Sequence, residues 1–252
     1  MTLVVDYMPQ LGITRVSRWI FNCYVIHDGD GGSVVVDAGL PRAADDLEPI
    51  LRNLAGSLQT IVATHTHSDH VAGAPELAKC HGAPIHLPAR ALAYLDGERP
   101  RNPTPSQVAK IWPVFLDQPF DHRGAIGLVR GQRVAGFGTS GTMRWSGPRP
   151  DSGLTDGQPL PGAPAWTVLS TAGHTDDSIA LWNQESQTLI SGDAVLCVGG
   201  RVWHTPEVVD THAARASAAR LQALQVAHLL PGHGRPVHAQ STVWEQKHRR
   251  GA

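Results

Sequence analysis

Three histidines and an aspartate stand together in the stretch THTHSDH, residues 64–70. Imidazole is the commonest metal-binding side chain in proteins and the usual general base. Side chains alternate between the two faces of an extended chain, so His65 and His67 point the same way and can chelate one ion. The chain then turns into an expected helix, and this turn aims Asp69 and His70 at a second position. The motif therefore predicts a site for two metal ions.

Three further candidate ligands each follow an expected buried strand and stand beside glycine. They are His174 in TAGHTDDS, Asp193 in ISGDAV and His233 in LLPGHG. Glycine lets the backbone approach a bound group closely, and functional side chains gather on loops that follow rigid strands. A single histidine at a strand end is more often a hydrogen-bonded structural residue. Three such residues in order, together with the 64–70 motif, favour metal ligands instead.

The type of donor indicates which metal is expected. All seven candidate side chains are imidazoles or carboxylates, and none is a thiolate. Zinc accepts this set and can keep an open position for water, so two zinc ions are expected. Iron or manganese remains an alternative, because nitrogen and oxygen ligands accept these metals too.

Strands and helices alternate along most of the chain. We predict a strand pair over 13–26 with a turn at 28–32, and strands at 33–39, 60–64, 83–88, 166–171, 178–183, 188–193 and 228–231. Helices are expected at 41–55, 71–81, 105–116 and 211–226, the last capped by Asp210 or Thr211, with helical turns at 89–95 and a terminal helix after the last strand. This order predicts an α/β protein of two similar halves packed as one domain, residues 1–252.

Residues 96–165 form a different kind of segment. Nineteen prolines occur in the chain, and about half of them fall in this Pro/Gly-rich insertion, whose periodicity is poor outside the expected helix. A loop of this length in a compact domain is often functional, for example as a lid or a substrate wall. An irregular hairpin that only packs on the core is the alternative.

The overall composition limits the classes of partner. The chain has 252 residues, 41% of them hydrophobic and 17% charged, and its net charge of −1 provides no basic surface for nucleic acid. Its three cysteines are far apart and are expected to be reduced and mostly buried. Neither a secretory signal nor an apolar run of about 20 residues is present. We therefore expect a cytoplasmic protein with a small-molecule substrate and no membrane or nucleic-acid partner; a homodimer remains open.

These motifs resemble those of the metallo-β-lactamase superfamily, from VVVDAG (34–39) to PGHG (231–234). The resemblance implies an αββα four-layer sandwich, in which two mixed β-sheets lie face to face between outer helices. It also implies a ligand assignment: His65, His67 and His174 for the first metal, Asp69, His70 and His233 for the second, and Asp193 as a bridge between both. Asp37 matches an aspartate that orients the site without binding metal.

The expected reaction is metal-assisted hydrolysis. Two divalent ions can lower the pKa of a shared water to about 7 and polarise a carbonyl group. The resemblance to glyoxalase II and to lactonases implies a zinc-dependent hydrolase that cleaves an ester, thioester or lactone with a metal-bridging hydroxide. Asp69 and Asp193 are the expected catalytic residues, because they hold the ions and can hydrogen-bond the nucleophile.

Several alternatives remain on the sequence alone. A persulfide dioxygenase-like oxidoreductase would use one iron, held by His65, His67 and either Asp193 or His174. Weak β-lactamase activity, a nuclease and a non-catalytic binding module are others. Asp176 and Asp177 depart from the Pro-Gly that many relatives carry there, and are expected to be exposed turn residues or to repel anionic substrates. Further candidates for substrate contact, each with core packing or surface exposure as the alternative, are Phe137, Arg144, Trp145, Trp203, His204 and His122; Cys197 is expected to pack in the core.

Overall fold

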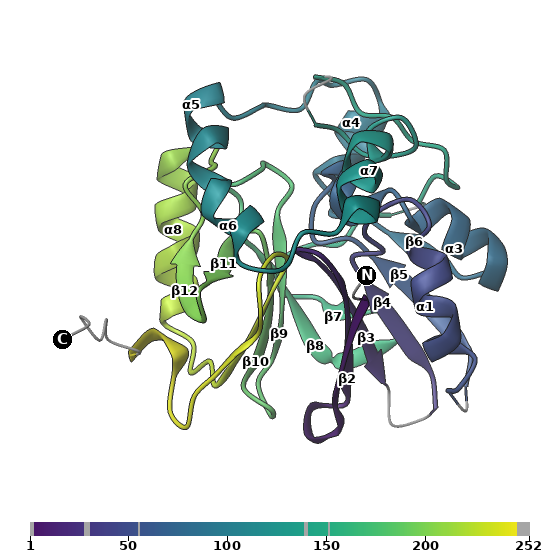
Figure 1. Cartoon of the computed structure of the whole chain (residues 1–252), viewed down its shortest axis with the longest axis horizontal. Coiled ribbons are helices and arrows are strands. Elements are labelled where there is room, and N and C mark those ends of the chain that lie inside the picture. The colour runs from purple at the N-terminus through teal and green to yellow at the C-terminus, as the bar shows by residue number, and fades with distance from the viewer. Residues whose placement is uncertain (1–2, 28–30, 55, 139–140, 151, 246–252) are drawn as a thin grey trace.

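A computed structural model describes residues 3–27, 31–54, 56–138, 141–150 and 152–245 (Figure 1). Within these residues the strands form two six-stranded sheets and one two-stranded ribbon. The expected turn at 28–32 lies partly outside the described residues, as do the residues after 245 where a terminal helix is expected.

The first sheet comes from the N-terminal part of the chain. Its order is β1 (Leu3–Met8), β2 (Ile13–Arg18), β3 (Phe21–His27), β4 (Ser33–Val36), β5 (Leu58–Val62) and β6 (Ile85–His86). Neighbours from β1 to β4 are antiparallel, whereas β4, β5 and β6 run parallel to one another. The expected strand pair over 13–26 is therefore confirmed as β2 and β3, while β1 was not predicted.

The second sheet comes from the C-terminal part. Its order is β14 (Val237–His238), β13 (His228–Pro231), β10 (Thr188–Gly192), β9 (Ile179–Asn183), β8 (Ala163–Ser170) and β7 (Pro159–Leu160). The β10–β13 pair is parallel and the other pairs are antiparallel, so this sheet is also mixed. The separate ribbon consists of β11 (Val195–Val198) and β12 (Arg201–His204).

The helices lie outside the sheets. They are α1 (Ala43–Leu51), α2 (Ser68–Val71), α3 (Ala74–His81), α4 (Ala91–Leu95), α5 (Pro105–Val108), α6 (Trp112–Leu116), α7 (His122–Gly131) and α8 (Thr211–Gln222), with 3-10 turns η1 (Pro9–Leu11), η2 (Ala109–Ile111) and η3 (Val243–Glu245). Figure 1 shows α1 and α3 outside the first sheet and α8 outside the second. The predicted cap of α8 is confirmed, because Asp210 accepts a hydrogen bond from the Ala213 N–H at 2.9 Å.

Alternation of side chains along the strands produces the four layers. In β3, Tyr24 and Ile26 join the core shared by the two sheets, whereas Cys23 and Val25 face the core under α1 and α3. In β10, Ile190 faces the shared core and Leu189 packs in the cluster that holds Leu221 of α8. Successive strand residues point to opposite faces, so buried strands read as nearly continuous apolar runs. The αββα arrangement expected from the sequence is confirmed.

The strand directions bring the candidate ligands to one edge. Strands β4 and β5 are parallel, and so are β10 and β13; β8 runs the same way as β10 because both are antiparallel to β9. The carboxyl ends of co-directional strands meet at one edge of a sheet, where ligands bind in open α/β sheets. A hydrogen bond of 2.8 Å from the Ile179 N–H to the Thr64 carbonyl oxygen joins the two sheets there.

The helix expected at 71–81 is two helices instead. Helix α2 begins at Ser68, inside the histidine motif, and α3 begins at Ala74. Gly73 separates them, and a Cβ atom at this position would lie 2.5 Å from the Ala38 carbonyl oxygen. The backbone at residue 73 therefore lies so close to the loop after β4 that only glycine fits at this position.

The Pro/Gly-rich insertion is more helical than expected. Helical structure over 105–116 is confirmed as α5, η2 and α6, but α7 was not predicted. Glycine lowers helix propensity, and α7 contains Gly124, Gly127 and Gly131. A Cβ atom on Gly127 would lie 2.9 Å from Leu40 Cδ1. These glycines therefore let α7 pack closely on the body of the protein.

The cysteines differ from expectation in one case. All three are free thiols; Cys23 and Cys197 are buried as predicted, but Cys80 is exposed near the end of α3. In the described part of the chain, no helix combines the length and apolar character that crossing a bilayer requires.

The shared core provides a first prediction. Leu181 lies between the sheets with 0% of its surface exposed, whereas Leu116 on α6 is 72% exposed. We expect Leu181→Ala to lower the free energy of unfolding by about 2–5 kcal/mol, and Leu116→Ala to change it by about 0.5 kcal/mol or less. Urea unfolding followed by tryptophan fluorescence measures both values. Similar losses for the two variants would contradict this account of the core.

Candidate metal centre

The structure brings all seven predicted ligands together at the edge between the sheets. Their donor atoms form three overlapping groups, within each of which the atoms lie no more than 4.8 Å apart. The groups are His65, His67 and His174; His65, His70 and Asp193; and Asp69, His70 and His233. Each group could hold a cation, and together they make one continuous cluster.

The first group presents three ring nitrogens to one another. His67 Nδ1 lies 3.1 Å from His65 Nε2 and 3.1 Å from His174 Nε2. Burial, followed by the neighbouring His174, lowers the pKa of His67 to about 3. Burial also lowers the pKa of His65. These two imidazoles are therefore neutral and can offer lone pairs to a metal.

Asp193 connects the first group to the second. Its carboxylate lies 3.5 Å from His174 Nε2 on one side, and 3.4 Å from His70 Nε2 and 3.1 Å from His233 Nε2 on the other. Asp69 completes the second group, with its Oδ2 atom 3.4 Å from His233 Nε2. A carboxylate in this central place can reach two cations at once.

Hydrogen bonds to the far nitrogen fix the orientation of three histidines. His174 Nδ1 lies 2.7 Å from the Glu207 carbonyl oxygen, and His233 Nδ1 lies 3.2 Å from the Ile20 carbonyl oxygen. A carbonyl oxygen only accepts, so each Nδ1 must carry a proton, and each Nε2 faces the carboxylate of Asp193. Asp37 holds His70 Nδ1 in the same way, at 2.9 Å. Such contacts orient ligands and raise their basicity.

The carboxylates around the second group favour positive charge on the atoms between them. Burial opposes protonation of His233, but the Asp193 and Asp69 carboxylates together outweigh it and raise the pKa of His233 to about 10. His70 behaves in the same way, because Asp193 and Asp37 outweigh its burial and raise its pKa. His70 Nε2 and Asp193 Oδ1 are also buried without a hydrogen-bond partner. A divalent cation would satisfy both atoms, so the residues fit a metal.

Asp37 and Asp177 hold the histidine motif at two different threonines. Asp37 Oδ1 accepts from the Thr64 N–H at 2.7 Å, and its Oδ2 accepts from the Thr64 hydroxyl at 2.8 Å. Asp177 Oδ2 accepts from the Thr66 N–H at 2.9 Å and from the Thr66 hydroxyl at 2.6 Å. The backbone before His65 and before His67 is therefore anchored by two buried carboxylates.

The expectation that Asp176 and Asp177 are exposed turn residues is wrong for Asp177, and Asp176 is only partly exposed. Asp177 is only 2% exposed, and burial raises its pKa although the Thr66 donors favour the charged form. Asp176 forms an ion pair with Arg101, so its charge is already compensated. The sequence could not reveal the role of Asp177, because its partner Thr66 lies 111 positions away.

Phe137 contributes to the centre through its packing. The chain at 137 runs beside the motif, since the Phe137 N–H donates to the Thr66 carbonyl oxygen and the Ser68 N–H donates to the Phe137 carbonyl oxygen. The buried Phe137 ring packs on the His67 ring with centroids 4.6 Å apart. Phe137 thus packs in the core, which was the alternative expected for it, and supports the His67 ring.

The other candidates for substrate contact divide between packing and surface. Trp145 and Trp203 pack against core clusters, and Cys197 is buried as expected. His122 is exposed at the start of α7 and lines a different cavity, which none of the seven candidate ligands lines. His204 is the exception, because it lines a cavity of about 320 Å³ that also borders His174. Small-molecule sites are commonly clefts of about this size.

Comparisons with known proteins identify the family. The sequence profile described as "Metallo-beta-lactamase superfamily" matches residues 18–233. The chain belongs to this superfamily. It is 25% identical to the "Probable metallo-hydrolase YflN" of Bacillus subtilis (strain 168), over 90% of this chain and 85% of the relative. A second Bacillus subtilis relative, "Probable metallo-hydrolase YqjP", is 23% identical, over 84% of this chain and 67% of its own. This superfamily membership and these relatives identify the chain as a metal-dependent hydrolase.

Solved structures of other proteins show the same fold. The metallo-beta-lactamase from Pontibacter korlensis superposes with a TM-score of 0.62 at 16% identity, over 94% of both chains. The protein TTHA1623, crystallised in a di-iron-bound form, gives a TM-score of 0.57 at 21% identity, also over 94% of both chains. At these identities the similarity establishes the fold of the chain but does not identify which metal it binds.

The anchoring carboxylate provides a second prediction. We expect Asp177→Ala to lower the free energy of unfolding by about 2–6 kcal/mol, because it leaves two buried donors of Thr66 without an acceptor, each costing about 1–3 kcal/mol. The neighbouring Asp176→Ala removes only a pair with the half-exposed Arg101 and should cost about 1 kcal/mol or less. Urea unfolding at matched metal content compares the two. Equal costs would show that Asp177 does not anchor the motif.

Proposed function

We propose that the centre holds two divalent cations, with zinc as the expected metal. His65, His67 and His174 would bind the first cation, Asp69, His70 and His233 the second, and Asp193 both. The central position of Asp193, the neutral imidazoles of His65 and His67, and the buried His70 Nε2 without a hydrogen-bond partner support this assignment. An all-imidazole and carboxylate set is a normal zinc environment, although iron or manganese also accepts it.

We infer that the reaction is hydrolysis of an acyl bond in an ester, thioester or lactone. When bound, the two cations would supply Lewis acidity and make a hydroxide nucleophile available at neutral pH. The chain itself must orient the ligands, which Asp37 and the Glu207 and Ile20 carbonyl oxygens do. These contacts hold the reacting groups in place before the substrate arrives.

Proton transfer is assigned to Asp69. Its side chain is partly exposed, whereas His70 and Asp193 beside it are buried. This partial exposure supports a position at which water can reach the Asp69 carboxylate. The Asp69 carboxylate can accept a proton from the attacking water and pass it to the leaving group, as a general base and then a general acid.

The cavity that borders His174 is the proposed entry for a small-molecule substrate. His204, Pro206 and Val208 lie on its wall together with small side chains of α8. An apolar cavity with a few polar groups beside a metal centre is the usual form of a small-molecule site. This arrangement supports a compact acyl substrate.

The iron-dependent dioxygenase is the less favoured alternative. It needs only one metal, yet all the residues of the second group are present and converge. The named relatives are also metallo-hydrolases. Two zinc ions per chain would favour the hydrolase, whereas one iron together with oxygen uptake would favour the dioxygenase.

Removal of single ligands tests the proposal. We expect His65→Ala and Asp193→Ala each to lower the metal content measured by elemental analysis. Each should also lower kcat/KM on a panel of lactones, thioesters and esters by more than about 100-fold, since loss of an orienting partner alone costs about 10–100-fold. His212→Ala, at an exposed histidine of α8, is the matched control and should change neither value. A His65→Ala protein that keeps full metal and full activity would refute the assignment.

A further inference from the structure

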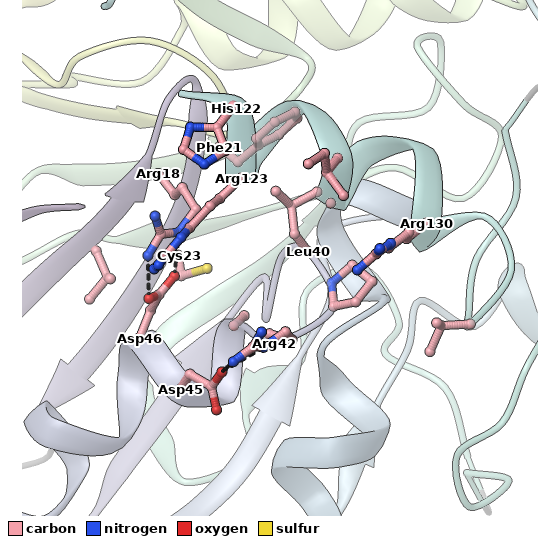
Figure 2. Close-up of a pocket in the computed structure, with 16 residues that line it drawn as sticks. Arg18, Phe21, Cys23, Leu40, Arg42, Asp45, Asp46, His122, Arg123 and Arg130 are labelled. Atoms are coloured by element: carbon pink, nitrogen blue, oxygen red, sulfur yellow. Dashed lines mark hydrogen bonds and ion pairs between the residues drawn. The ribbon is translucent and has the colours of Figure 1, made fainter. Parts of the chain in front are cut away.

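A second cavity lies outside the metal centre, between α7 and the start of α1. Its volume is about 440 Å³, within the range of small-molecule sites. Figure 2 shows its walls: β2 and β3 contribute Arg18, Phe21 and Cys23, the loop before α1 contributes Leu40, and α7 contributes Arg123 and Arg130. None of the seven candidate metal ligands lines it.

The floor of this cavity is apolar. Val16, Phe21, Cys23 and Leu40 line it, and each of these residues is buried. Burial strongly raises the pKa of the Cys23 thiol, so the thiol is uncharged. The rim adds Ile126 and Val134, two large apolar side chains that are exposed to solvent. An occupant with an apolar body would cover these surfaces and remove them from water.

The charges around the cavity leave an excess of positive charge. Arg18 is paired with Asp46 at 2.5 Å, and Arg42 is paired with Asp45 at 2.7 Å. In the part of the chain that the structure describes, no ion pair involves Arg123 or Arg130. Figure 2 shows these two side chains on either side of Leu40. The two guanidinium groups can therefore each form charge-assisted hydrogen bonds with an anion.

From this geometry we propose that the cavity binds an anionic amphiphile, a small molecule with a carboxylate head and an apolar tail. The tail lies on Phe21, Leu40 and Ile126, and the head is held by Arg123 and Arg130. A purely apolar molecule would leave the two charges unused, and a small inorganic anion would leave the floor exposed. Only a ligand with both parts complements both surfaces.

The cavity backs directly on the metal centre. Phe21 lines the cavity, and its ring also packs edge-to-face on the His233 ring, with centroids 5.4 Å apart. The cavity and the metal centre are therefore separated by the Phe21 ring. None of the candidate metal ligands lines the cavity. The proposed binding depends on neither the metal nor the acyl hydrolysis proposed above.

Calorimetric titration of the full, metal-loaded chain with octanoate tests the proposal. We expect saturable binding of one octanoate per chain, at concentrations where octanoate is monomeric. Octanol has the same tail without the charge, and acetate has the head without the tail; both should bind at least about 10-fold more weakly, a factor that one charge-assisted hydrogen bond corresponds to. Equal binding of octanol and octanoate would overturn the role of the arginines.

Variants with matched controls locate the site. Arg123→Gln combined with Arg130→Gln should weaken octanoate binding at least about 10-fold, whereas Arg133→Gln, at an exposed arginine outside the lining, should not. Ile126→Trp should fill the cavity and abolish binding, whereas Val129→Trp, also exposed on α7 but not lining it, should not.

Two results would overturn the proposal. The first is unchanged octanoate binding in both Ile126→Trp and the double arginine variant, because the carboxylate would then bind elsewhere, such as at the metal. The second is binding only to anionic vesicles and not to monomeric octanoate, because the surface would then recognise a bilayer. Hydrolysis of the substrate panel by the same variants should stay unchanged, so failure of this proposal is distinct from failure of the proposed function.

Discussion

One buried carboxylate, that of Asp37, ties together the segments that make the metal centre. It follows β4, is fully buried, and contacts Thr64 after β5 and His70 in α2. Asp37 holds a left-handed backbone angle, φ 58°, which costs a non-glycine residue about 1–3 kcal/mol. Three hydrogen bonds in the buried interior offset this cost. If Asp37 moved, the backbone before His65 and the His70 ring would move with it.

Much of this arrangement follows from local sequence rules. Apolar runs such as SVVV (33–36) and TLIS (188–191) are typical of strands buried on both faces. The seven candidate ligands could be predicted because each follows such a strand, and strands running in one direction end at one edge. The pairing of β2 with β3 and the cap of α8 at Asp210 could also be predicted, because each depends on residues close together in the sequence. Prediction worked where a few neighbouring residues determine the outcome.

The rest depends on contacts that no local pattern encodes. The Ile20 and Glu207 carbonyl oxygens orient His233 and His174 from positions 213 and 33 residues away, and any residue type can supply a carbonyl oxygen. Asp177 looked like a turn residue because its neighbours favour turns, yet burial against Thr66 decides its role. Helix α7 was missed because glycine has low helix propensity; close packing on Trp19 and Leu40 overrides this preference.

The central claim is that side chains from distant segments converge on a pair of cations beside Asp193. Anomalous diffraction at the zinc absorption edge, from crystals of the full chain, tests it most directly. The account predicts two peaks about 3.5–4 Å apart, one bounded by His65, His67 and His174 and the other by Asp69, His70 and His233. Asp193 should contact both peaks. Zinc-loaded crystals with no peak among these side chains would contradict the account.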